Sequence, residues 1–330
     1  MTSASARSIL GAVALGSCLA LALTACGSEA SSSSNKGMTE LVAVVAPIQF
    51  EAAYLADELG YFEEQGLDVE IRPGADPTAN IAMAMSGEAD LITASWGVMT
   101  TSTAEGIPIR AVVGNGIVDA KSDNSGILVP EGSSVDEISD LENKTVAMVG
   151  VNTGGDIPML QAMAAQGGDP ASIKQVAVPY AGMQAALEQG TVDAAFPADS
   201  YYHQMVEAGY RVVSNPIREY QAYSAGTLWA ATSSWLEENP DSAVKFSAAM
   251  KKAINYYNEP ANIDTVRGVT ARVNAVEVAD VDPKKYAPMS SDFYVDAGQE
   301  LVDAYEDLGL VETPLSAEEI LWAEAGRTTK

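Results

Sequence analysis

Polar and aromatic side chains stand directly after the predicted strands of this sequence, where they can meet a small ligand. Gln49 and Phe50 follow the first strand, and Ser95 and Trp96 follow the third. Ligands of open α/β sheets bind beyond the carboxyl ends of the strands. We therefore expect these four side chains to contact a ligand, with the two aromatic rings stacking on a flat molecule.

Two further loops extend the same edge of the predicted sheets. Asn152, Thr153 and Gly154 precede a predicted helix, so that their backbone N–H groups can converge on an electron-rich group. Asp199 and Tyr201 follow a later strand, and Asp199 can either bind a ligand amine or hold a hinge. None of these strand ends carries an arginine or a lysine. This pattern weakens a free sulfonate or nitrate as the ligand and favours a polar heteroaromatic molecule.

Residues that commonly perform catalysis are scarce. The chain has a single histidine, His203, and its two cysteines, Cys18 and Cys26, both lie near the N-terminus. The motifs of serine hydrolases, zinc peptidases, phosphate-binding loops and thiol redox sites do not occur in the sequence. We therefore expect a protein that is not an enzyme and that has no cofactor and no metal site.

The charge of the chain excludes one class of partner. The sequence holds 45 acidic against 18 basic residues, which gives a net charge of −27. Such a field repels the phosphates of nucleic acids, so no nucleic-acid partner is expected. The acidic residues are spread along the chain, which is typical of a well-solvated surface.

The N-terminus has the pattern of an export signal. An apolar run from Ile9 to Leu23 is shorter than a membrane-spanning helix needs and ends in Leu23-Thr24-Ala25-Cys26. This ending resembles the lipobox of bacterial lipoproteins, and a Gly/Ser-rich stretch follows it. We predict a signal peptide at 1–25, acylation of Cys26, a flexible tether at 26–38 and an extracytoplasmic location at the cell membrane. Cleavage before Cys18 and an uncleaved anchor are the alternatives.

Short β-branched runs alternate with helical stretches, a pattern typical of βαβ units and parallel sheets. Strands are predicted at 41–45, 68–71, 91–94, 108–113, 125–129, 145–149, 175–178, 194–196 and 210–213. Helices are predicted at 51–64, 78–86, 135–141 (with Ser134 as N-cap), 156–165, 181–188, 201–208, 241–257, 292–308 and 317–325. From residue 228 onward we expect mainly helices.

These elements predict two α/β lobes, each a mainly parallel sheet flanked by helices, with a hinge and C-terminal helices. The chain is expected to cross between the lobes near 124–125 and near 223–226. Lobe 1 would comprise 39–124 plus 225–330, and lobe 2 would comprise 125–224. A cleft between two hinged lobes is a favoured site for a small ligand, and we expect the protein to be a monomer.

Several short motifs carry a family resemblance over about residues 40–215. The helix 53–59 leads into Gly60-Tyr61-Phe62 and then Gly66-Leu67-Asp68-Val69, and Gly87-Glu88-Ala89-Asp90 is echoed by Gly190-Thr191-Val192-Asp193. In order, these resemble the nitrate/sulfonate/taurine and thiamine-pyrimidine-precursor group of substrate-binding proteins of ABC transporters. Asp90 and Asp193 are interpreted as structural turn residues. Ser200 replaces the proline of the family pattern, which leaves the path of that loop open.

The resemblance implies a two-lobed fold like that of the type II periplasmic binding proteins, with its pocket at the loops described above. It further implies an ABC permease and its ATPase as partners, and a lipid-anchored protein that captures a small organic molecule, sulfonate-like or heteroaromatic, by hinge closure. A pyrimidine-precursor-synthase-like enzyme on the same fold is one alternative, against which the export signal and the single histidine count. A sensor lipoprotein without a transport role is the other.

Overall fold

The interior strands of this chain bury both of their faces, because successive apolar residues face opposite sides of each sheet. The computed structural model describes residues 37–330 except 75, 122, 152–155 and 283–285. In strand β1 (Thr39–Val45), Leu41 and Val45 join one apolar cluster and Val44 joins another. Each sheet therefore needs helices on both sides, and the chain supplies them.

The first sheet combines strands from both ends of the described chain. Its order is β2-β1-β3-β10-β4, and β10 runs antiparallel to both of its neighbours whereas the other pairs are parallel. Besides β1, its strands are β2 (Leu67–Pro73), β3 (Leu91–Ala94), β4 (Ile109–Gly114) and β10 (Leu228–Thr232). The sheet is thus mixed, with one reversed strand in its interior.

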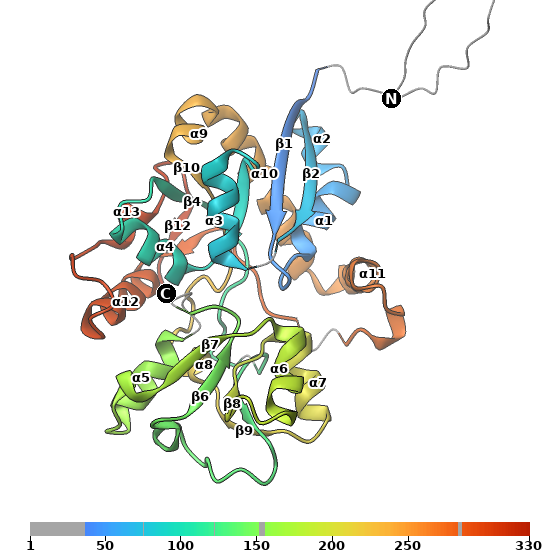
Figure 1. Cartoon of the computed structure of the whole chain (residues 1–330). Coiled ribbons are helices and arrows are strands. Elements are labelled where there is room, and N and C mark those ends of the chain that lie inside the picture. The colour runs from blue at the N-terminus through green and yellow to red at the C-terminus, as the bar shows by residue number, and fades with distance from the viewer. Residues whose placement is uncertain (1–36, 75, 122, 152–155, 283–285) are drawn as a thin grey trace, which may run out of the picture. The chain divides into compact units, whose positions relative to one another are not determined.

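Helices cover the two faces of the first sheet (Figure 1). One apolar cluster lies under α1 (Glu51–Glu58), α2 (Tyr61–Glu64), α9 (Ser233–Glu238), α10 (Pro240–Asn258) and α11 (Ile263–Asn274). The other lies under α3 (Pro77–Ser86), α4 (Trp96–Ala104), α12 (Val295–Asp307) and α13 (Ala317–Ile320). A short parallel pair, β11 (Phe293–Tyr294) with β12 (Arg327–Thr328), ties the C-terminus to the start of α12.

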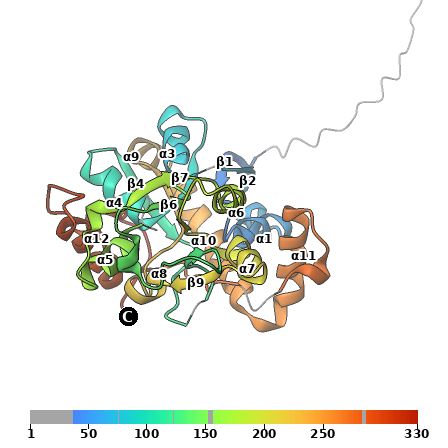
Figure 2. The ribbon, with the colours of Figure 1, turned by 60° about the horizontal axis from the view of Figure 1, so that its bottom comes forward.

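The second sheet is built from one continuous stretch of the chain and repeats the same plan. Its order is β7-β6-β8-β5-β9, and β5 is antiparallel to β8 and β9. Its strands are β5 (Ile127–Val129), β6 (Thr145–Met148), β7 (Lys174–Ala177), β8 (Ala194–Ala195) and β9 (Arg211–Ser214). Figures 1 and 2 show α5 (Ile157–Ala165) and α8 (Pro216–Tyr220) on one side, and α6 (Tyr180–Glu188) and α7 (Asp199–Glu207) on the other.

Within the described residues, no helix is both long enough and apolar enough to cross a membrane. Short 3₁₀ turns at Ile138–Leu141, Pro170–Ser172, Pro260–Asn262 and Val278–Asp280 complete the regular structure.

The single helix predicted at 51–64 is two helices. Gly60 adopts a left-handed backbone conformation with φ of 71°, which ends α1 and starts the one-turn α2. A residue with a Cβ rarely adopts this conformation, so the glycine sets the break. The periodic apolar spacing across 53–59 gave no sign of it, because both helices face the same core.

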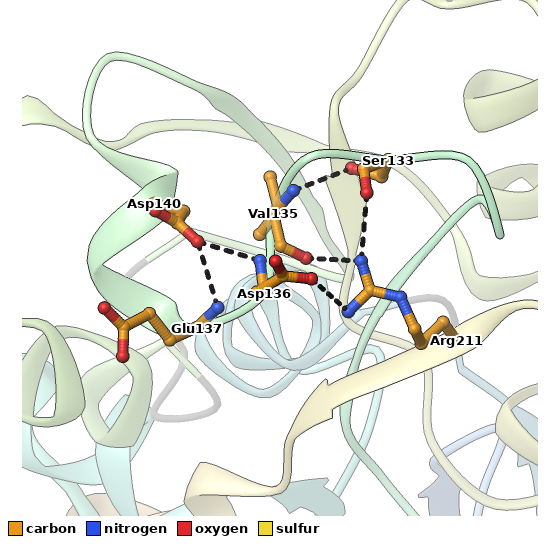
Figure 3. Close-up of polar contacts among 6 residues, drawn as sticks. All are labelled: Ser133, Val135, Asp136, Glu137, Asp140 and Arg211. Atoms are coloured by element: carbon orange, nitrogen blue, oxygen red, sulfur yellow. Dashed lines mark hydrogen bonds and ion pairs between the residues drawn. The ribbon is translucent and has the colours of Figure 1, made fainter.

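The helix predicted at 135–141 is wrong, as is its N-cap Ser134. Only a 3₁₀ turn forms at its end, capped by Glu137, because side chains satisfy the preceding backbone instead (Figure 3). Asp140 accepts hydrogen bonds from the N–H groups of Asp136 (2.8 Å) and Glu137 (3.2 Å). The guanidinium of Arg211 donates to the carbonyls of Ser133 (3.1 Å) and Val135 (2.7 Å) and pairs with the Asp136 carboxylate at 3.2 Å.

The sequence also failed to predict β10 and α11. Every residue of β10 is buried, so the run Leu-Trp-Ala-Ala-Thr lacks the alternation that identifies a strand. A short continuous apolar run is compatible with either a strand or a helix, and its place in a sheet depends on distant residues.

Candidate functional site

Two adjoining cavities lie at the carboxyl ends of the strands, and they share Pro47, Ile48, Gln49 and Asp199 in their walls. The first cavity has a volume of about 140 Å³ and the second about 380 Å³. Gln49 follows a strand of the first sheet and Asp199 a strand of the second. We call the two cavities together the cleft. Residues far apart in the sequence therefore converge on it from both sheets.

Gln49 is held by a hydrogen-bond network that fixes the orientation of its amide. The Thr227 hydroxyl accepts hydrogen bonds from the Asn115 amide and from the Gly116 N–H, both at 2.9 Å. It therefore donates its only proton to Gln49 Oε1, at 2.6 Å. A second Asn115 proton binds the Gln49 backbone carbonyl at 2.8 Å. Gln49 lines both cavities, so this network holds its amide at the wall of the cleft.

Ser95 and Trp96 both line the first cavity, but in different ways. Ser95 is the N-cap of α4 and accepts a hydrogen bond from the Val98 N–H at 3.3 Å. Trp96 is only 1% exposed, packs against Phe293, and donates its indole N–H to the Gly298 carbonyl at 3.0 Å. Trp96 thus lies at the predicted place, but its ring is largely enclosed by α12. Ligand contact at both positions remains a prediction.

Phe50 lines the second cavity next to a residue that the sequence analysis passed over, Glu51. Phe50 is 7% exposed and packs edge-on against Tyr54, with ring centroids 5.9 Å apart. Glu51 is 6% exposed and accepts a hydrogen bond from Thr270 at 3.2 Å. Burial raises the pKa of Glu51, while its own backbone N–H and the Thr270 hydroxyl act in the opposite direction.

Asp199 is the acidic residue that both cavities share. It begins α7 with a left-handed φ of 50°, so the predicted helix 201–208 starts two residues earlier than expected. Its carboxylate accepts a hydrogen bond from the Asn124 amide at 3.0 Å, and its N–H binds the Asn124 carbonyl at 2.6 Å. Burial, and then the charge of Glu51, raise the pKa of Asp199 to about 7. The Asn124 bond offsets only part of this rise.

Tyr201 forms an aromatic wall with Tyr180, which the sequence analysis did not select. The two rings stack with centroids 5.7 Å apart and planes inclined by 24°. Tyr180 lines the first cavity and Tyr201 the second, so that the pair stands where the cavities adjoin. Burial and then the Asp199 charge raise the pKa of Tyr180, which keeps this phenol neutral. The pair offers a polar rim and flat faces to a ligand ring.

Some predicted residues cannot be placed. Asn152, Thr153 and Gly154 lie outside the described residues, as does Cys26 with the predicted signal peptide and most of the tether. Their roles as ligand contacts and as the lipidation site stay predictions.

Charged residues of the cleft share one sign over the part of the chain that the structure describes. Neither cavity is lined by an arginine, a lysine or a histidine among these residues. No group of three or more histidine, cysteine, aspartate or glutamate side chains there is placed to hold a metal ion. The sequence did contain a signal for Glu51, because it lies four residues before Leu55 on the buried face of α1. No local pattern marks Thr227, Asn124 or Tyr180.

Comparison with solved structures identifies the fold. The alkanesulfonate-binding protein SsuA from Xanthomonas axonopodis pv. citri, bound to MOPS, superposes with a TM-score of 0.73 at 16% identity, over 88% of this chain and 98% of that one. The nitrate-binding protein NrtA from Synechocystis PCC 6803 gives 0.66 at 15% identity, over 86% and 84%. The desulfurization enzyme DSZB gives 0.58 at 13% identity, over 86% and 96%. The predicted α/β periplasmic-binding-protein fold is confirmed.

None of the curated protein sequences is significantly similar to this chain. The model of one protein family, described as NMT1/THI5 like, does match residues 48–263. This stretch includes the motifs around Gly60, Asp90 and Asp193 and most of the cleft. The chain belongs to the NMT1/THI5-like family.

Proposed function

We propose that this protein is the solute-binding component of an ABC importer and captures a small organic molecule in the cleft. One observation carries the proposal: Gln49 from the first sheet and Asp199 from the second line the same cavities. Family membership and the likeness to binding proteins for alkanesulfonate and nitrate support it. Capture from two sides lets ligand binding draw the sheets together.

The proposed hinge lies where two segments of the chain cross between the sheets. Val118 and the segment 223–224 exchange backbone hydrogen bonds of 2.6 and 3.0 Å, and Ile117 forms an antiparallel bridge with Ala225. Paired crossing segments can bend together while the sheets stay intact. We propose 39–124 plus 225–330 as lobe 1 and 125–224 as lobe 2. A ligand shifts such a pair of lobes toward closure only by its higher affinity for the closed state.

The described walls of the cleft favour a heteroaromatic ligand over a free sulfonate. The Tyr180–Tyr201 stack and the Gln49 amide can hold a polar ring. An anion would have no arginine, lysine or histidine to bind among the described lining residues. The same shortage of histidine and lysine favours binding over catalysis, although an enzyme, DSZB, shares the fold.

We further propose that Cys26 is acylated and anchors the mature chain outside the cell, where it delivers its ligand to a permease with an associated ATPase. The lipobox-like sequence before Cys26 supports the anchor. Replacing Cys26 with Ser should release the protein from the membrane fraction, and unchanged fractionation would contradict the anchor.

Thermal unfolding tests the central proposal. A ligand that binds only the native state raises the midpoint, by an amount that grows with its concentration over Kd. We expect an unfractionated metabolite extract of the source organism to raise the midpoint of the purified protein. Native mass spectrometry of the same sample then gives the mass of the bound compound. If no metabolite binds in either measurement, solute capture is wrong.

A further inference from the structure

The second cavity collects several acidic side chains in its walls. Its acidic lining residues are Glu51, Asp199, Glu207, Asp280 and Asp282. Most acidic residues of the chain lie on the surface, where water solvates them. In a cavity that also holds Phe50, Tyr257 and Tyr286, the same charges are partly removed from water.

Glu51 is the most enclosed of these acids, and its hydrogen bonds leave it poorly satisfied. Besides its own backbone N–H, its donor among the described residues is the Thr270 hydroxyl, 3.2 Å from Oε1. That hydroxyl has a single proton and also lies 3.1 Å from the Val266 carbonyl and 2.7 Å from the Tyr286 hydroxyl. The Glu51 carboxylate therefore competes with Val266 and Tyr286 for the proton of the Thr270 hydroxyl. Because the Glu51 side chain is only 6% exposed, a cation bound beside it would stabilise its ionised form.

Asp199 adds a second carboxylate beside flat aromatic faces. Its carboxylate accepts from the neutral Asn124 amide, and it shares one cavity wall with Tyr180 and the other with Tyr201. Aromatic faces attract cations through the ring quadrupole. The Gln49 amide lines the same cavities, and because its oxygen accepts from Thr227, its N–H groups are the donors that it can offer a ligand. The cleft thus offers acceptors for a cation together with donors for a neutral or negative acceptor.

We propose that the ligand carries an organic cationic group, a protonated amine, amidine or ring nitrogen, which pairs with Glu51 and Asp199, and an acceptor group that binds the Gln49 amide. This inference rests on the proposed solute-binding function and narrows its substrate class. It separates the chain from an anion-binding protein on the same fold, because the pair of carboxylates would repel a free sulfonate or nitrate.

The raised pKa values of the two carboxylates make ligand binding depend on pH. Burial and Glu51 raise the pKa of Asp199 to about 7, and burial also raises the pKa of Glu51. The titratable groups that interact with this pair are Tyr180, Tyr257 and Tyr286, and burial raises the pKa of all three, so that they stay neutral. A cation must therefore displace a proton at low pH. Its affinity should fall as the pH drops through about 7, by up to about tenfold per pH unit.

The experiment separates the metabolite extract by charge. A cation-exchange resin in acid retains compounds with a basic nitrogen, and an anion-exchange resin at neutral pH retains acids. Each fraction and the neutral flow-through are added to the full-length protein in buffer containing EDTA, and the unfolding midpoint is measured. We expect the cation-exchange fraction to raise the unfolding midpoint. The compound responsible is then purified, and its affinity is measured by calorimetry at about pH 5.5 and about pH 8.

Charge-removing variants with matched controls complete the test. E51Q and D199N keep the acceptors for Thr270 and Asn124, and asparagine tolerates the left-handed backbone at 199. Each should weaken binding of the purified compound by about thirtyfold or more. The controls are E58Q, on the exposed end of the same helix, and D193N, in the second sheet's turn. Both should leave the affinity unchanged.

The outcomes distinguish this inference from the function beneath it. Activity in the anionic or neutral fraction would overturn the cationic ligand while leaving solute capture intact. A fraction that raises the unfolding midpoint without EDTA but not with EDTA would replace the organic cation with a metal ion. An inactive extract in every fraction would remove both proposals. Equal affinities of E51Q, D199N and the controls for a basic compound would place its site elsewhere.

Discussion

The two edges of the sheets use carboxylates in opposite ways. At the turns that enter the strands, Asp90 accepts a hydrogen bond from the Val42 N–H and Asp193 one from the Thr145 N–H, both at 2.8 Å and both 48 residues away. Each aspartate also donates its own N–H to a carbonyl, Asp90 to that of Val42 and Asp193 to that of Thr145. At the opposite edge, side chains from distant elements donate to the cleft acids: the Thr270 hydroxyl to Glu51, beside its own backbone N–H, and the Asn124 amide to Asp199. Backbone N–H groups bind the first pair, whereas the second pair lines the cleft.

The comparison explains why a repeated motif identifies a fold but not a ligand. A turn acid that binds a backbone N–H does the same work in any relative with the same turn. A cleft acid depends on side chains that come from several elements, such as Thr270 on α11 and Asn124 between the sheets. Its partners can change without disturbing the fold.

Substitution of Trp96 tests whether every residue at the carboxyl ends of the strands contacts the ligand. Its ring is 1% exposed and packs so closely on α12 that a Cβ at Gly298 would lie 2.4 Å from it. W96A should therefore cost about 3–5 kcal/mol of unfolding free energy, measured by urea titration, because it opens a cavity in the core. A loss below about 1 kcal/mol combined with weaker ligand binding would instead assign the ring to the site.

The pH dependence of stability should differ between the two pairs. Because folding raises the pKa of Asp199 from 3.8 to about 7, the native state holds this proton more tightly than the unfolded chain does. The contribution of Asp199 to stability is fully present below the pKa of the unfolded chain, and it is lost as the pH rises through the pKa of the folded protein. One such group gives a slope of at most about 1.4 kcal/mol per pH unit.

We expect D199N to flatten the decline in unfolding free energy between about pH 4 and pH 7 in the ligand-free protein. Glu51, whose pKa is also raised, should leave a residual slope in this variant. D193N provides the control, since its amide oxygen can still accept from Thr145. A D199N curve that matches the wild type would show that Asp199 is solvated in solution.

Removing the turn carboxylates should reduce stability without affecting binding. D90A leaves the Val42 N–H, in the middle of β1, without its acceptor and should cost about 1–2 kcal/mol. D193A should cost about 0.5–1 kcal/mol, because its hydrogen bond is exposed and water can replace it. Unfolding curves and calorimetry on the same samples separate the two effects. A change in ligand affinity in D90A or D193A would show that the turn carboxylates also take part in binding.

The smallest effect is expected at Gly116, where the network around Gln49 can be disturbed alone. A Cβ there would lie 1.8 Å from Gln49 Oε1, so G116A must displace a flexible side chain. The Gln49–Thr227 hydrogen bond should be lost, with roughly tenfold weaker ligand binding and a change in stability below about 1 kcal/mol. Q49A should reproduce the loss of affinity, and unequal effects would mean that Gly116 acts through the backbone.

The sequence predicted the repeating αβ units because their signals are local. Strand β1 and the turns at Gly87 and Gly190 combine apolar runs with a glycine that ends a helix. The positions of Gln49, Phe50, Ser95, Trp96, Asp199 and Tyr201 in the walls of the cleft followed from the rule that ligands bind at strand ends. The direction of each side chain did not follow, and Trp96 turns into the core because α12, some 200 residues later, covers it.

Long-range contacts account for what the sequence did not predict. Thr227 reaches Gln49 across a separation of 178 residues, and Thr270 reaches Glu51 across 219. The failed helix at 135–141 has the same cause, since Arg211 ties down its backbone from strand β9 (Figure 3). No window of neighbouring residues contains such information.

Strand β10 has a consequence for how the chain reaches this structure. It lies between β3 and β4, so the first sheet cannot close until residues 228–232 have been synthesised. The second sheet is contiguous in sequence and has all its strands by residue 214. Because local pairings form faster than distant ones, the second sheet should form first, and the first sheet should be completed only when β10 pairs with β3 and β4. The second sheet should thus form first, although the first sheet contains the earliest strands of the chain.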